Sequence, residues 1–136
     1  MDPAWLKSQI LSSPSQAPET AAANAKEVLD IQKAGARIVA GTDEPEAMYL
    51  HSELAAYVRF GMTPYEALRA ATVTPAKFLG LDAGVIAPGK LADIVLVQDN
   101  PLDNIANAHR VRRVIANGRM FTIGELLSGK AKDAPH

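Results

Sequence analysis

Ala36-Arg37-Ile38-Val39-Ala40-Gly41-Thr42-Asp43 is the stretch that decides the fold class of this sequence. Its β-branched pair, Ile38-Val39, predicts a short buried strand that ends at Gly41. The hydroxyl of Thr42 and the carboxylate of Asp43 follow the carboxyl end of this strand. In α/β folds, ligands and catalytic groups gather at that end of the strands. Asp43 is therefore a candidate for chemistry, although a turn former or a helix cap is the commoner role of an Asp after a strand.

Composition limits the classes of protein that fit this chain. It has 136 residues, of which 48% are hydrophobic and 21% charged, as expected for one folded domain. A formal net charge of −1 gives no electrostatic reason to expect nucleic acid or an anionic membrane as partner. Cysteine is absent, which excludes disulfides, thiolate metal sites and cysteine nucleophiles. Three histidines, His51, His109 and His136, leave any His-rich metal centre incomplete.

Neither a membrane-spanning segment nor a signal peptide is expected. No apolar run is long enough to cross a bilayer. The first residues, Met1 to Trp5, lack the basic-then-apolar pattern of a signal peptide. These observations slightly favour the cytoplasm and leave the compartment open.

Helical patterns surround the predicted strand. A first helix is expected from Pro18 to about Lys33, with Gly35 as its stop, and a second from about Glu46 to Phe60. Thr63 and Glu66 form a capping box that starts a third. Thr74-Pro75 restarts a short helix in the same way, and Gly80 ends it. One strand among these helices has no partner, so residues 1–80 would make a poor free-standing domain.

From Leu81 onward the sequence predicts β structure. Val85-Ile86 is expected to be a short strand, and residues 87–90 fit a type II turn with Pro then Gly at its centre. Residues 94–97 are apolar throughout, as in a strand buried on both faces. Residues 101–108 form a polar connection or a helical turn.

A hairpin is predicted near the end of the chain. Residues 111–116 and 119–123 flank Asn117-Gly118, the strongest short hairpin signal. Residues 123–127 are expected to form a last helical turn, and the polar tail to His136 is expected to fray.

Motifs from Ala40 to Arg119 carry a family resemblance. In order they are AGTD (40–43), HSEL (51–54), GMTPYEALRAAT (61–72), PAKFLG (75–80), GVIAPGKLAD (84–93), NPL (100–102) and VIANGR (114–119). The chain thus resembles the C-terminal part of the metal-dependent amidohydrolase superfamily, closest to its imidazolonepropionase-like and prolidase-like members. Single motifs are unremarkable, whereas this colinear series is specific.

The resemblance implies an α/β fold in two parts. Residues 1–80 would be the end of a distorted (β/α)8 TIM-like barrel, with residues 36–40 as its last strand and helices after it. Residues 81–136 would be the C-terminal portion of the small β-sandwich that flanks such barrels, with a disordered tail.

The resemblance also implies a role for Asp43. In such enzymes the Asp after the last barrel strand binds the divalent metal ion, for which zinc is preferred. It also accepts a proton from the attacking water and delivers it to the leaving group. The reaction implied is hydrolysis of a carbon–nitrogen bond in an amide or cyclic amide of a small-molecule substrate. His51, Thr42 and Glu44 are candidates for orienting Asp43 or contacting that substrate.

The other metal ligands of the family have no counterpart here. A His-x-His pair, a Lys or Glu and two further His lie on earlier strands, and no histidine precedes His51. A hydrolytic zinc needs three protein ligands and a water, which Asp43, His51 and His109 would supply only if the fold brought them together. We therefore expect a segment of a longer hydrolase that is inactive alone. The alternative is a non-catalytic segment that completes a barrel with another polypeptide or self-associates.

Several candidates have a structural interpretation as well. His51 is either a buried histidine bonded to a backbone carbonyl or a group that orients Asp43. Glu44 and Glu46 also suit the first turn of a helix. Glu53 is expected to face solvent or to pair with Arg59 or with neighbouring lysines.

Asp93 and the arginines near the hairpin have structural interpretations. Asp93 is expected to accept backbone N–H bonds from the turn at Pro88 to Lys90. Arginines at 110, 112, 113 and 119 are typical of charged strand edges rather than of a nucleic-acid site.

Overall fold

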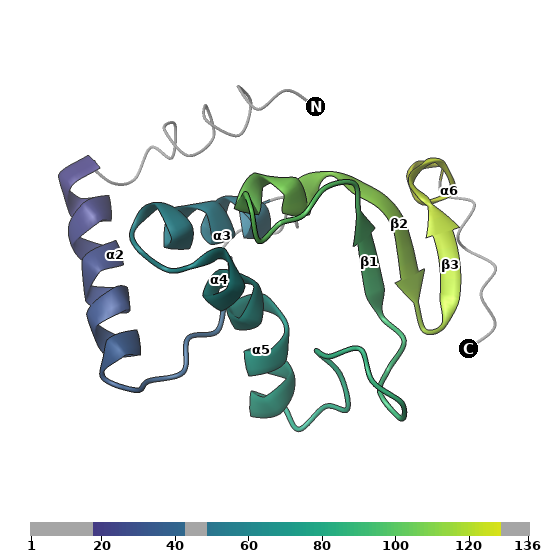
Figure 1. Ribbon diagram of the computed structural model, residues 1–136, viewed down its shortest axis with the longest axis horizontal. Coiled ribbons are helices and arrows are strands. Elements are labelled where there is room, and N and C mark those ends of the chain that lie inside the picture. The colour runs from purple at the N-terminus through teal and green to yellow at the C-terminus, as the bar shows by residue number, and fades with distance from the viewer. Residues whose placement is uncertain (1–17, 43–48, 129–136) are drawn as a thin grey trace.

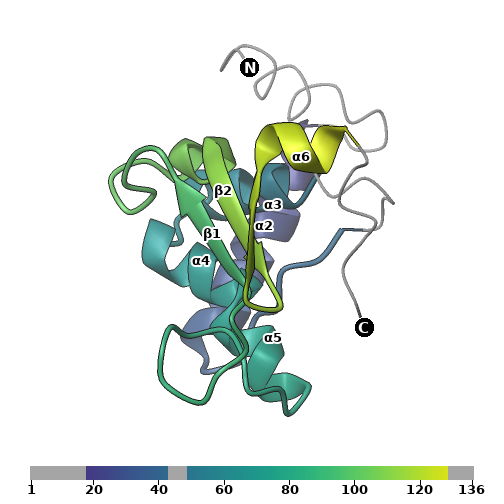
Figure 2. The same cartoon turned by 90° about the vertical axis from the view of Figure 1, so that its right-hand side faces the viewer.

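The computed structural model describes residues 18–42 and 49–128, with helices on one side and a sheet on the other (Figure 1). The helices are α2 (Pro18–Lys33), α3 (Tyr49–Arg59), α4 (Pro64–Ala71), α5 (Val73–Phe78), the 3-10 helix η1 (Ile105–His109) and α6 (Ile123–Leu127). The strands are β1 (Ile94–Val97), β2 (Val111–Ala116) and β3 (Arg119–Thr122). Figure 2 looks onto the sheet, with α3 and α4 behind it. None of the helices in the described residues has the length and apolar character of a membrane span.

The two long helices follow their sequence signals. α2 has the predicted bounds and ends before Gly35, whose φ of +95° is the left-handed conformation expected of a glycine stop. The observed α3 begins at Tyr49, and residues 46–48, where the prediction placed its start, lie outside the described residues. Gly61 follows α3 with φ +117°, and a Cβ on it would lie 3.0 Å from Cδ2 of Leu29 on α2. α2 and the end of α3 therefore touch at this glycine.

The capping box of α4 is confirmed. Oγ1 of Thr63 accepts the backbone N–H of Glu66 at 3.2 Å, and the backbone N–H of Thr63 donates to Glu66 Oε2 at 2.7 Å. α5 begins one residue earlier than Thr74, at Val73, and ends before Gly80. Pro75 therefore lies inside the first turn of α5, where a missing N–H is tolerated.

Residues 36–40 do not form the predicted strand. Within the described residues the sheet contains β1, β2 and β3 alone, so no strand lies beside this segment. A strand is defined by its partners, and these would be other strands of a barrel. The segment is instead attached to α4, because the N–H of Ala40 donates to the carbonyl of Ala70 at 2.8 Å.

The sheet is antiparallel in the order β1-β2-β3. β1 pairs with β2 through Ile94 and Ile115, and a register shift follows at Leu96/Val97. Asn117 (φ +49°) and Gly118 (φ +78°) connect β2 to β3, as the predicted two-residue hairpin turn requires.

Two predictions for the sheet region are wrong and one is confirmed. Val85-Ile86 does not form a strand, and Ile86 is 84% exposed. β1 is not buried on both faces, because Val95 is 56% exposed and no described element covers it. The turn after Ala87 is confirmed, since its carbonyl accepts the N–H of Lys90 at 3.3 Å and Gly89 has φ +81°.

A buried cluster joins two of the α-helices to η1. Leu54 of α3, Ala67 of α4 and Ile105 of η1 form a buried cluster. η1 therefore connects the helical side of the molecule to the strands.

Candidate functional site

The predicted site begins beside α4. The bond from Ala40 to Ala70 fixes the segment that leads to it, and Thr42 is half-buried two residues further on. Asp43 and Glu44 lie outside the described residues, so their predicted roles remain predictions.

His51 and His109 lie together, although they are far apart in the sequence. His51 is in the first turn of α3 and His109 is the last residue of η1. Their ring centroids are 6.4 Å apart and their planes meet at 75°, an edge-to-face arrangement. The sequence assigned His109 to the β part alone, and only the packing of η1 on α3 brings the two imidazoles together.

Burial favours the uncharged form of His51. The Nδ1 atoms of His51 and His109 are both buried, and within the described structure neither has a hydrogen-bond partner. Burial lowers the pKa of His51, and the neighbouring His109 lowers it further. His51 therefore presents a neutral imidazole at neutral pH, a form able to accept a hydrogen bond or bind a metal ion.

Glu53 does not face solvent as predicted. Its side chain is half-buried on α3, and burial raises its pKa above the usual range of a glutamate. The described residues form no ion pair with it, and the guanidinium of Arg59 lies over the ring of Phe60 instead, 5.6 Å from its centroid. Burial, and then the charge of Glu53, raises the pKa of Tyr57.

Asp93 has a structural role, but with a different partner. Its Oδ1 accepts the backbone N–H of Asn117 at 2.6 Å, in the β2–β3 turn rather than in the turn at Pro88. The carbonyl of Ala92 accepts the N–H of Gly118 at 3.1 Å. Together these bonds attach the hairpin turn to the entry of β1.

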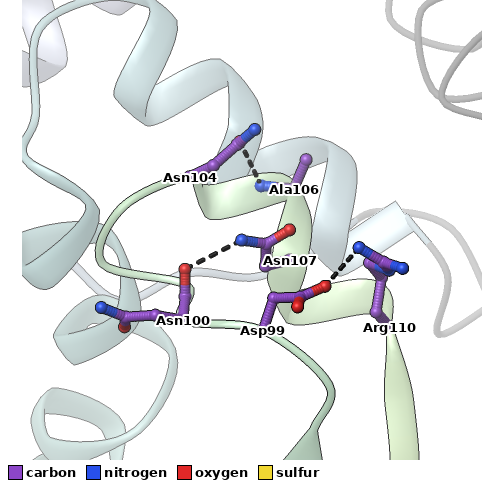
Figure 3. A network of polar contacts seen from close by, with 6 residues as sticks. All are labelled: Asp99, Asn100, Asn104, Ala106, Asn107 and Arg110. Atoms are coloured by element: carbon purple, nitrogen blue, oxygen red, sulfur yellow. Dashed lines mark hydrogen bonds and ion pairs between the residues drawn. The ribbon is translucent and has the colours of Figure 1, made fainter.

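A network of asparagines and one ion pair surrounds η1, and the sequence did not reveal it (Figure 3). Oδ1 of Asn104 caps η1 by accepting the N–H of Ala106 at 3.0 Å. Nδ2 of Asn107 donates to the carbonyl of Asn100 at 2.9 Å, and Arg110 pairs with Asp99. Arg119 stacks over Phe121, with its guanidinium 4.8 Å from the ring centroid. Of the arginines near the hairpin, Arg110 and Arg119 thus each contact a side chain of this chain.

A hollow of about 150 Å³ lies beside the start of the predicted strand. It contains none of the predicted site residues. Its lining comes from α2, the 36–38 segment, and the region of α4 and α5: Gln32, Ala36, Arg37, Ile38, Met62, Glu66, Arg69, Ala70 and Thr74.

The described residues do not by themselves fit a hydrolytic metal centre. Among residues 18–42 and 49–128, no three His, Asp or Glu side chains are grouped so as to hold a metal ion. His51 and His109 offer two imidazoles, whereas a hydrolytic zinc takes three protein ligands.

Comparison with known proteins identifies the family. Residues 9–121 match the model of the Amidohydrolase family. Adenine deaminase from Methanosphaera stadtmanae is 38% identical over 57% of this chain and 13% of its own length. Adenine deaminase from Methylobacterium nodulans is 40% identical over 66% of this chain and 15% of its own.

Solved structures agree with this match. A Xaa-Pro dipeptidase crystallised with methionine in its active site superposes with a TM-score of 0.66 at 28% identity, over 74% of this chain and 25% of that one. The chain therefore spans a small part of the proteins it resembles. Because the family match extends over residues 9–121 of the 136, the chain belongs to the amidohydrolase family of hydrolytic enzymes.

Proposed function

We propose that this chain is the C-terminal segment of a metal-dependent hydrolase that breaks a carbon–nitrogen bond in an amide or cyclic amide. The observation that supports the proposal is the family match over residues 9–121, which includes the AGTD stretch and every motif after it. The names of its relatives point the same way, since a deaminase and a dipeptidase both break carbon–nitrogen bonds. Because the two named enzymes act on different substrates, the proposal specifies the type of bond and a small-molecule substrate, but not which molecule.

Asp43 is the catalytic residue and a metal ligand in this proposal. Its position supports this, because it follows the segment that Ala40 attaches to α4. The metal ion, for which we propose zinc, would polarise the substrate and activate water when bound. Asp43 would take up the proton of that water and return it to the leaving nitrogen. Thr42, Glu44 and His51 would orient Asp43 or contact the substrate.

Residues 1–80 would complete a barrel and residues 81–136 part of a flanking sandwich. The remaining metal ligands would then come from a preceding barrel segment, since the described residues do not group three ligands. We therefore expect the 136-residue chain alone to be inactive and to bind zinc weakly. Hydrolysis assays on amide substrates with added zinc, together with zinc titration calorimetry, test this. Metal-dependent hydrolysis by the chain alone that is lost in Asp43→Asn would contradict it.

A second candidate is a non-catalytic segment that completes a barrel with another polypeptide or by self-association. Apolar exposure favours it, because Ile86 and Val95 are 84% and 56% exposed and the segment at Val39 has no partner strand among the described residues. Size-exclusion chromatography over a range of concentrations is the test. Association should weaken in Val95→Lys and persist in the control Asp103→Lys, which also changes an exposed side chain. A monomer at all concentrations would argue against self-association.

A further inference from the structure

The turn between β2 and β3 has a chemical property that neither hydrolysis nor assembly uses. It consists of Asn117 and Gly118, which are both exposed, at the end of the sheet where β1 begins (Figure 1). Both residues have positive φ, +49° and +78°, and the paired residues Ala116 and Arg119 close the hairpin around them. This is the arrangement of a type I′ turn, the usual turn for an Asn-Gly pair between antiparallel strands.

An Asn-Gly pair can undergo deamidation without an enzyme. The peptide nitrogen of the glycine loses its proton to water or hydroxide and forms a bond to Cγ of the asparagine. The bond from Cγ to the side-chain nitrogen breaks, and this nitrogen takes up a proton from water and leaves as ammonia. Water then opens the resulting succinimide ring at either carbonyl carbon, which leaves aspartate or isoaspartate. Glycine favours the attack because it has no Cβ to obstruct its nitrogen.

Asn117 is the asparagine of this chain that is best placed in sequence for the reaction. The asparagines are at positions 24, 100, 104, 107 and 117, and Asn117 alone precedes a glycine. Asn100 precedes Pro101, whose nitrogen carries no hydrogen to lose. Asn104 precedes Ile105, whose branched side chain crowds its nitrogen. These positions therefore serve as internal comparisons.

The conformation of the turn keeps the reacting atoms apart. Ring closure requires rotation about the Cα–C bond of Asn117 until the Gly118 nitrogen eclipses Cβ. In a type I′ turn the ψ angle of the first central residue is about +30°, which points this nitrogen away from Cβ. Because the reacting atoms must be close and aligned, the attack requires the turn to leave its folded conformation.

Two hydrogen bonds from the entry of β1 hold that conformation. Oδ1 of Asp93 accepts the N–H of Asn117 at 2.6 Å, and the carbonyl of Ala92 accepts the N–H of Gly118 at 3.1 Å. The second bond occupies the N–H that must be removed before the attack. The carboxylate of Asp93 also opposes the negative charge that develops on the Gly118 nitrogen as its proton leaves.

We propose that Asn117 is a site of spontaneous deamidation that the entry of β1 protects in the folded chain. While Ala92 and Asp93 hold the turn, the succinimide forms slowly. When the turn is released, the Gly118 nitrogen reaches Cγ of Asn117 and the reaction proceeds. It consumes water, releases ammonia and needs no other reagent.

The product changes the hairpin itself. Aspartate at this position adds a carboxylate to the residue whose N–H binds Asp93, so two negative charges lie near one another. Isoaspartate adds a methylene group to the backbone of a turn whose length sets the pairing of β2 with β3. Either product weakens the attachment of the turn to β1.

Mass spectrometry of the intact chain after incubation at mildly alkaline pH tests the proposal. Samples are digested in acid, and the peptide that contains Asn117 is followed for the exchange of its amide for a carboxyl group and for isoaspartate. We expect deamidation in the folded wild type to be about fivefold or more slower than in the chain unfolded by guanidinium chloride, the factor that one hydrogen bond supplies. Asn100 should stay unmodified in both samples.

A pair of variants separates the turn from general stability. Asp93→Ala removes one of the two bonds and should speed the reaction in the folded chain by about fivefold or more. Asp93→Asn keeps an oxygen acceptor and should be slower than Asp93→Ala. Thr63→Ala is the matched control, because it also lowers stability but acts at the start of α4, and it should leave the rate at Asn117 unchanged.

Specific outcomes would overturn the proposal. Equal rates at Asn117 in the folded and the unfolded wild type would do so, as would an Asp93→Ala variant that reacts no faster than the wild type. An equal increase in Thr63→Ala and Asp93→Ala would show that global unfolding, and not release of the turn, controls the reaction. Should Asp93→Ala fail to fold, the comparison of folded and unfolded wild type decides the question.

Discussion

At the scale of single residues, Asp93 makes a side-chain bond to a residue 24 positions further along the chain. Its Oδ1 accepts the N–H of Asn117 at 2.6 Å and attaches the hairpin turn to the strand before it. We predict that Asp93→Ala lowers the free energy of unfolding by about 1–3 kcal/mol, because it leaves this N–H without its charged acceptor. Urea denaturation measures the change.

Two substitutions sharpen this prediction. Asp93→Asn keeps an oxygen acceptor and should restore most of the stability, whereas the exposed Asp103→Ala should change it by less than about 0.5 kcal/mol. A loss in Asp93→Ala no larger than in Asp103→Ala would show that the bond contributes nothing.

Gly84 offers a second test of a single position. Its φ is +82°, and a Cβ there would lie 2.6 Å from the carbonyl oxygen of Thr72, which is backbone and cannot move aside easily. Gly80 has a similar φ of +68°, but a Cβ there meets nothing within 4 Å. We predict that Gly80→Ala costs about 1 kcal/mol from backbone strain and that Gly84→Ala costs clearly more. Thermal unfolding of the two variants compares them, and equal costs would mean that the approach of Thr72 is not tight.

At the scale of elements, the capping box sets the start of α4. We predict that Thr63→Ala lowers stability by about 0.5–2 kcal/mol at neutral pH, since the first turn loses its side-chain acceptor. The backbone N–H of Thr63 lowers the pKa of Glu66, so the contribution of this carboxylate is present above about pH 4.3 and is lost as the pH falls further. The bond from the Thr63 N–H to the Glu66 carboxylate should therefore weaken in acid. Denaturation of the wild type and Thr63→Ala at about pH 7 and about pH 3.5 checks this. A loss of stability in Thr63→Ala that is larger at the lower pH would contradict it.

Elements also differ in how far the sequence predicts them. α2, the capping box at Thr63 and the turn at Asn117-Gly118 were predicted correctly, because each depends on residues within one or two turns of the chain. Residues 36–40 and Val85-Ile86 were not, because a strand depends on partners that local sequence does not specify. The prediction that β1 is buried on both faces was wrong for a related reason. An apolar run shows that a strand could be buried, but it does not show which element covers it.

The candidate site shows the same division. Thr42 and His51 were proposed from motifs near one another in the sequence, and the exposure of Glu53 was predicted wrongly because burial depends on packing. The contact of His51 with His109 could not be predicted, because it arises only when η1 packs on α3. Sequence reasoning thus named candidate site residues, which stay predictions, and missed the contact of His51 with His109.

At the scale of the whole molecule, the chain spans 25% of the solved Xaa-Pro dipeptidase and leaves the side chains of Val95 and Ile86 exposed. In an assembled hydrolase these surfaces would be covered and the missing metal ligands supplied. The role of Asp43 is therefore best measured in such an assembly.

A chimera provides that assembly. This chain would replace the equivalent C-terminal part of the Xaa-Pro dipeptidase, and hydrolysis of a Xaa-Pro dipeptide would be followed with added zinc. We predict that Asp43→Asn lowers kcat by about 10²–10⁴-fold, the usual effect of losing a general acid–base group, because an amide cannot take up the proton. Asp103→Asn, an exposed position of the same residue type, should leave kcat unchanged. An active chimera in which Asp43→Asn matches its parent would remove Asp43 from the chemistry and favour the assembly role, because the chain would then complete the barrel without supplying a catalytic group.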